Sequence, residues 1–238
     1  MSYNFDQHPG KPGQIWVLMA AVLVLLMWVF GMATWASAQK LASPATPAII
    51  TPPLGNAVFL AGHAVGTQGY VCLPTGTGAS WTVNGSRPEA NLFASNSGHT
   101  LPVITHFLSP ITTPNKFAPK PLLFGSATWQ SSADGSKVWG QAIHAIPAGS
   151  DASCPNTGAI GCLLLQSIGA EKGPAGGTII SRTTFIQQLN TRGGSPPASG
   201  CSVASDVGKQ TLVPYTADYY FFRQMHRDFK TRRKFEMF

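Results

Sequence analysis

Charged side chains are scarce in this chain, and acidic ones most of all. Asp, Glu, Lys and Arg make up 11% of the 238 residues, and only nine residues are acidic, whereas ordinary globular domains carry about 25% charged residues. Glycosidases need two paired carboxylates, and no spacing pairs any two of the six within residues 55–222: Glu89, Asp134, Asp151, Glu171, Asp206 and Asp218. The Gly-x-Ser-x-Gly turn of serine hydrolases is also absent. No catalytic residue is predicted, and a function other than catalysis is favoured.

A sustained helical pattern is missing after residue 55. The chain contains 25 Gly and 19 Pro, which favours short strands and turns over helices. We predict a mainly β domain at residues 55–222, folded as a single two-sheet sandwich or a flattened barrel. The expected strands are residues 57–61, 67–73, 80–83, 90–94, 101–107, 126–130, 137–146, 162–168, 178–188 and 212–222.

Cysteines are few, and no Cys-x-x-Cys pair of the kind that binds zinc occurs. The four cysteines, Cys72, Cys154, Cys162 and Cys201, allow three pairings. Cys154 and Cys162 enclose a Pro-Asn-Thr-Gly turn, as a small disulfide-closed loop would, so we predict Cys154–Cys162 and therefore Cys72–Cys201. Disulfides would place the domain outside the cytoplasm. The alternative is four reduced cysteines in a cytoplasmic domain.

Residues 15–38 form an apolar run without charge, matching the roughly 20 residues of a membrane-spanning helix. Trp16 and Trp35 bracket the run at headgroup spacing, while Trp28 and Gly31 lie between them, where a partner helix can approach. We therefore expect one transmembrane α-helix before the β domain. The alternative is a signal peptide cleaved after Ala38, because Ala36-Ser37-Ala38 has the small-x-small form.

The expected location is the bacterial inner membrane, crossed once. Residues 1–14 form a cytoplasmic tail, and the β domain lies in the periplasm, as the cysteines indicate. Residues 39–54 contain four prolines and are expected to be an extended linker.

Residues 223–238 differ in kind from the domain, because six basic residues outnumber two acidic ones. Apolar residues alternate with this charge, as in a basic amphipathic segment that lies on anionic lipid or in an acidic groove of a partner. A solvated, disordered tail is the alternative, and nucleic acid is not an expected partner. The predicted contacts are Arg223, Arg227, Phe229, Lys230, Arg232, Arg233 and Lys234.

Two further resources for binding remain in the domain. His106 and His144 are weak candidates for a metal site, but no histidine pair has the short spacing of a metal motif, and no cofactor is predicted. Aromatic residues offer a face for a sugar or a protein. About half of them are expected to lie in the core instead. These aromatic residues are Trp81, Trp129, Trp139, Tyr215, Tyr219 and Tyr220.

Several ordered blocks carry a family resemblance. They include GTQGYVC at 66–72, HFLSP at 106–110, ATWQSSADGSKVW at 127–139, LNTRGG at 189–194, GC at 200–201 and VPYTADYYFF at 213–222. The chain from Pro53 to Phe222 resembles a family of bacteria and fungi that is known only as a domain of unknown function. The resemblance implies a secreted, β-rich domain and supports the Cys72–Cys201 pair, but it implies no activity.

The chain departs from that family by its long anchor, its Cys154/Cys162 pair and its basic tail. These additions favour a membrane-anchored accessory subunit that docks onto a larger membrane protein complex, for which a respiratory or photosynthetic complex is one candidate host. The expected partners are thus the lipid bilayer and subunits of such a complex. The alternative is a cell-envelope module that binds glycan or a small ligand, and a metal-dependent redox enzyme is a third hypothesis.

Overall fold

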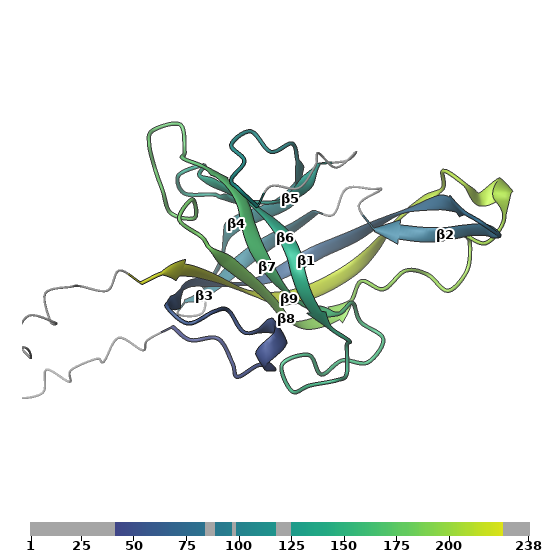
Figure 1. Ribbon diagram of the computed structural model, residues 1–238, viewed down its shortest axis with the longest axis horizontal. Helices are drawn as coiled ribbons and strands as arrows, with labels where there is room; N and C mark the ends of the chain where they lie inside the picture. The colour runs from purple at the N-terminus through teal and green to yellow at the C-terminus, as the bar shows by residue number, and fades with distance from the viewer. Residues whose placement is uncertain (1–40, 84–88, 97–98, 118–124, 226–238) are drawn as a thin grey trace, which may run out of the picture. The chain divides into compact units, whose positions relative to one another are not determined.

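The structure is a computed structural model, and it describes residues 41–83, 89–96, 99–117 and 125–225. The described chain is mainly β, as predicted (Figure 1). Its only helical elements are two 3-10 turns, η1 (Ala48–Ile50) and η2 (Ala204–Asp206). The strands are β1 (Asn56–Thr75), β2 (Gly78–Val83), β3 (Glu89–Asn96), β4 (His99–Ser109), β5 (Ser126–Ser131), β6 (Lys137–Ile146), β7 (Cys162–Glu171), β8 (Phe185–Gly193) and β9 (Gln210–Gln224).

These strands form one antiparallel sheet that closes on itself. Neighbouring strands pair in the order β1, β3, β4, β5, β6, β7, β8 and β9, and β9 pairs again with β1 from Asn56↔Gln224 to Val71↔Gln210. Strands β2 and β3 follow each other along the same edge of β1, so they share one position in the ring. The two-sheet sandwich is therefore wrong, because a single sheet encloses the core. The flattened-barrel alternative is the closer description.

Strand β1 is continuous where the sequence predicted two strands with a break between them. Gly62 and Gly66, in the predicted break at residues 62–66, do not form a turn. They allow β3 to lie close to β1. A Cβ at Gly66 would lie 2.5 Å from the Cα of Ala90, and one at Gly62 would lie 3.1 Å from the Cβ of Leu92. Since only glycine fits such a contact, β1 keeps its direction and pairs with both neighbours.

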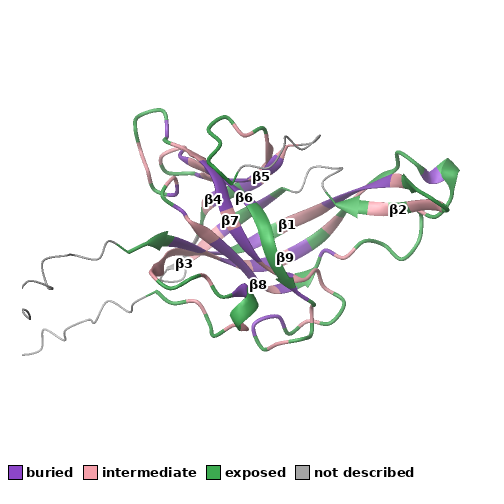
Figure 2. Cartoon of the chain, viewed as in Figure 1, coloured by how far each residue is buried: buried purple, intermediate pink, exposed green. Residues whose placement is uncertain are grey.

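Residues 178–184, predicted as the start of a strand, form a turn that covers the core. Two of their backbone donors bond to side chains, and Thr184 N–H bonds to Phe222 O of β9 (2.8 Å). Ile179 N–H donates to Asp134 Oδ2 (2.8 Å) and Ile180 N–H to Ser136 Oγ (3.2 Å). The fully buried Ile180 side chain joins the main core cluster, which includes Ile104, Trp129 and Phe221. Figure 2 shows that buried residues follow the strands of the ring, while most loops are exposed.

The predicted linker is partly folded onto the domain. Ile50 is fully buried against Cys154, Cys162 and Leu189. The side chain of Gln187, also fully buried, donates from Nε2 to Ile50 O (2.7 Å) and to Thr46 Oγ1 (3.3 Å). Residues 46–50 are therefore held against β8 and do not act as a free extended spacer.

Both predicted disulfides are present. Cys72–Cys201 ties the loop before β9 to the end of β1, where β1 and β2 project from the ring (Figure 1). On the same projection, Trp81 Nε1–H donates to Ser199 O (3.1 Å). Cys154–Cys162 closes the short loop between β6 and β7. Because all four sulfurs are paired, no cysteine is left for metal binding.

The two ends of the described domain lie close together. Met225 N–H donates to Gly55 O (2.8 Å), and Leu41 lines a surface hollow with Phe59 and Tyr220. No helix within the described residues is long and apolar enough to cross a membrane. The predicted span at 15–38 lies outside those residues, as does the basic tail after Met225.

Candidate functional site

A cavity of about 340 Å³ lies inside the closed sheet. Seven of the nine strands contribute to its wall, so it lies within the ring and not in a loop. Its mouth includes Val83, Gln141 and Ala142, which are all exposed. The other lining residues are Gln68, His106, Leu108, Ser126, Ala127, Trp129, Gly140, Leu163, Leu165, Ile168 and Gln188.

His106 is the titratable side chain of this cavity, and it is held neutral. It lies on β4 opposite Trp129 of β5 and is 6% exposed. Burial lowers the pKa of His106 to about 4, although the hydrogen bond to the Thr128 carbonyl acts in the opposite direction. That bond joins Nδ1 to Thr128 O at 2.8 Å. Because a carbonyl can only accept, Nδ1 carries the proton, and Nε2 of the neutral ring is a free acceptor.

Trp129 forms the aromatic wall beside His106. The two rings stack with centroids 4.3 Å apart and planes 8° from parallel, and Tyr219 and Phe221 meet the indole edge-on. Gly140 on β6 leaves room for this indole, since a Cβ there would lie 2.8 Å from Trp129 Cζ3. Within the described residues Trp129 Nε1 is enclosed without a hydrogen-bond partner, which is uncommon for a buried donor.

A chain of polar groups lies beside these rings. Tyr219 Oη donates to Gln188 Oε1 (2.7 Å), so the hydroxyl of Tyr215, 3.3 Å away, must donate to Tyr219. Burial raises the pKa of both tyrosines, and it raises the pKa of Tyr219 well above the ordinary value. Both hydroxyls therefore stay protonated at neutral pH, and the hydrogen of each is already used within the protein.

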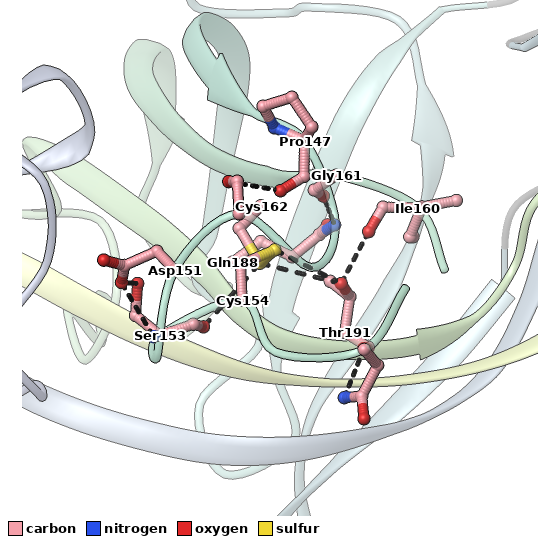
Figure 3. Close-up of a disulfide and its surroundings, with 11 residues drawn as sticks. Pro147, Asp151, Ser153, Cys154, Ile160, Gly161, Cys162, Gln188 and Thr191 are labelled. Carbon is pink, nitrogen blue, oxygen red and sulfur yellow. Dashed lines mark hydrogen bonds between the residues drawn. A yellow bond between two sulfur atoms is a disulfide. The ribbon is translucent and has the colours of Figure 1, made fainter. Parts of the chain in front are cut away.

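The Cys154–Cys162 disulfide supports this wall of the cavity (Figure 3). Its loop places Gly161, whose carbonyl accepts from Gln188 Nε2 at 3.3 Å. Both sulfurs are fully buried, and Thr191 Oγ1 lies 3.8 and 3.6 Å from them while donating to Ile160 O. The disulfide is thus inaccessible to a dissolved reductant and has a structural role.

Among the described residues that line the cavity there is no Asp, Glu, Lys or Arg. Burying an ion without a partner is costly, so the cavity is suited to an uncharged molecule. Its lining combines apolar side chains with a few polar atoms, the composition of many small-molecule sites.

The comparisons with known proteins identify the family but no activity. The model of the family described as "Protein of unknown function (DUF3455)" matches residues 53–223. The chain belongs to this family. The resemblance noted in the sequence is thereby confirmed. No curated protein and no solved structure matches the chain.

In this DUF3455 domain the two histidines predicted as metal ligands do not share a site. His106 lies inside the ring and His144 is exposed on β6, and the described residues contain no group of three or more His, Cys, Asp or Glu that can hold a metal ion. Arg223, at the end of β9, lies over the ring of Phe59 at 5.2 Å. The other predicted membrane or partner contacts lie outside the described residues.

Of the six aromatic residues considered for a binding face, Trp81 and Tyr220 are half-buried. The other four are buried: Trp129, Trp139, Tyr215 and Tyr219. Closure of the sheet turns one face of every strand inward, and Trp129, Tyr215 and Tyr219 lie in that interior core. Trp139 is buried with its Nε1–H donating to Ser109 Oγ (2.8 Å).

Sequence reasoning in this DUF3455 domain missed Gly140 and Gln188 as site residues. The position of Gly140 could have been noticed, because a glycine within a predicted strand often marks a close approach of another group. No sequence feature indicated Gln188, since its role depends on its hydrogen bond with Tyr219 on the neighbouring strand.

Proposed function

We propose that the domain binds a small, uncharged and largely apolar molecule inside its closed sheet. The observation that carries the proposal is the cavity of about 340 Å³, which is lined, as far as the structure describes the chain, by uncharged residues that include the neutral His106. Closed sheets of eight strands commonly hold one small ligand in this position. The small-ligand alternative is favoured over glycan binding, because a sugar would need exposed aromatic residues.

The proposed location is outside the cytoplasm, at the bacterial inner membrane. Two disulfides support an oxidising compartment, since such bonds persist there and are rare in the cytosol. The uncharged run at residues 15–38 supports retention at the bilayer, with the domain in the periplasm. The bound molecule would then be held close to the membrane surface.

The first test compares two tryptophan substitutions on β6. Ala142 lines the exposed mouth of the cavity, whereas Ala145 is exposed on the same strand and does not line it. We expect Ala142→Trp to block entry and Ala145→Trp to leave it open. The full-length proteins are purified in mild detergent, and mass spectrometry measures the small molecules released on denaturation. A compound present in wild type and Ala145→Trp should fall at least about tenfold in Ala142→Trp; identical profiles would contradict the proposal.

A second candidate function is the accessory subunit, and one surface feature favours it. Leu54 is fully exposed, and Met225, which is 51% exposed, adjoins it through the bond to Gly55. Leu41 is 42% exposed at the same end of the domain. Such apolar residues at both ends of the described domain are suited to contact a membrane assembly.

Native purification tests this second candidate. If the protein is a subunit, it should migrate with partner proteins in a fixed ratio, and Leu54→Asp with Met225→Asp should release them. Leu101→Asp provides the control, since Leu101 is exposed on β4. Migration of the wild-type protein alone would exclude the accessory role.

A further inference from the structure

We propose that His106 selects ligands that carry a hydroxyl or N–H group, which donates a hydrogen bond to its Nε2 atom. This inference rests on the proposed function and specifies the ligand class of the same cavity. It makes His106 a specificity-determining residue and not a metal ligand or a general base.

The direction of the Nδ1 hydrogen bond decides what His106 offers. Nδ1 faces the strand backbone and bonds to Thr128 O at 2.8 Å. This bond uses Nδ1 and leaves the other ring nitrogen, Nε2, on a side chain that lines the cavity. With Nδ1 protonated, Nε2 can accept a hydrogen bond but cannot donate one unless the ring becomes a cation.

Nε2 is both unpartnered and reachable. The described residues make no hydrogen bond to it, because the only bond of this side chain is the one from Nδ1. The enclosed, unpartnered polar atoms of the described residues are Trp129 Nε1 and Gln187 Oε1. Nε2 is not one of them, so it keeps accessible surface, and the His106 side chain lines the cavity.

Within the described residues, no charged side chain shifts the pKa of His106, which responds only to burial and to the Thr128 hydrogen bond. The groups that pack against the imidazole are Trp129 of β5 and Tyr219 of β9, at centroid distances of 4.3 and 5.9 Å, and its partner on β3 is Ala90. None is acidic or basic, and the Tyr219 hydroxyl already donates to Gln188. A ligand hydroxyl can therefore supply the donor that Nε2 lacks. A carboxylate has no hydrogen to donate, and its negative oxygen would face the lone pair of Nε2.

The test uses three probes of similar size: 4-fluorophenol, which donates a hydrogen bond; 4-fluoroanisole, which has the oxygen but no donor; and 4-fluorobenzoate, which is an anion. Their binding to the full-length protein in mild detergent is measured by fluorine NMR at pH 7. We expect 4-fluorophenol to bind about three- to tenfold more tightly than 4-fluoroanisole, as for one net hydrogen bond, and no binding of 4-fluorobenzoate.

Two variants distinguish the hydrogen bond from partition of the probes into detergent. His106→Phe keeps a ring beside Trp129 but removes the lone pair of Nε2. In this variant the ratio of 4-fluorophenol affinity to 4-fluoroanisole affinity should fall to about the ratio with which detergent without protein takes up the two probes. His144→Phe is the matched control and should keep the wild-type ratio, because His144 is exposed outside the cavity lining. The wild-type comparison stands by itself if His106→Phe does not fold.

The outcomes distinguish this inference from the proposed function. Equal binding of phenol and anisole to wild type, lost in Ala142→Trp, would overturn the role of His106 while leaving the cavity as a binding site. Preferred binding of 4-fluorobenzoate would also overturn it. If no probe binds wild type better than Ala142→Trp, the proposed function fails and the inference fails with it.

Discussion

Replacing Cys72 and Cys201 by serine should lower the free energy of unfolding by roughly 4–5 kcal/mol, the largest single effect expected in this domain. The bond joins residues 129 positions apart, so reduction frees a very long loop in the unfolded chain. In the chain-entropy description the stabilisation grows with the logarithm of loop length. Equilibrium unfolding in urea, followed by tryptophan fluorescence, measures the loss.

The second disulfide supplies the matched control. Cys154 and Cys162 are only 8 positions apart, so serine at both should cost roughly 2–3 kcal/mol by the same relation. The difference between the two double variants reports on loop length, because each removes one disulfide bond. Equal losses would show that local packing around the sulfurs, rather than loop closure, determines the contribution.

Acidification from pH 7 to pH 4 should destabilise the domain by roughly 3 kcal/mol through His106 alone. Burial lowers the pKa of His106 from 6.5 to about 4. Between these values the unfolded chain binds a proton that the folded protein excludes, so stability falls as the pH falls through this window. Below about pH 4 both states are protonated, and the contribution of His106 becomes constant.

The acidic residues act in a lower pH window and can be separated from His106. Burial alone would raise the pKa of Asp134, but hydrogen bonds from Ile179 and Ser136 outweigh it and lower the pKa to about 2. The pKa of Asp206 is also about 2, chiefly through Lys209. Their stabilisation is present above about pH 4 and is lost as the pH falls toward 2.

Urea unfolding at several pH values measures the effect of His106. The His106→Phe variant should lose the slope between pH 6.5 and 4 while keeping the decline below pH 4. His144→Phe, at an exposed position of β6, should retain both. An unchanged slope in His106→Phe would show that another group carries the pH dependence.

The sequence identified much of this fold at the level of local pattern. Strands 126–130 and 137–146 were predicted almost as they occur, since Asp134 and Gly135 mark the turn between them. The disulfides followed from cysteine spacing. The sequence did not predict that part of the linker packs on the domain, because the burial of Ile50 depends on Gln187, which lies far along the chain.

The candidate site was harder to predict than the strands. His106 was named with His144, but for metal binding, because a sequence does not show whether a histidine faces other ligands or an aromatic ring. Its stacking on Trp129 and the bond to Thr128 depend on the register between β4 and β5. For the same reason the sequence did not show which of the six aromatic residues lie in the core.

What the sequence determined by itself was local: the β class, the turns, the pairing of cysteines and the family. These follow from backbone preferences and from residues that lie near one another or are few enough to enumerate. Only the tertiary structure decided that β9 returns to β1 and closes the sheet. Alternation along a strand defines two faces, but the face that becomes interior depends on strands far apart in sequence. That closure created the cavity and turned Trp129, Tyr215 and Tyr219 inward around His106.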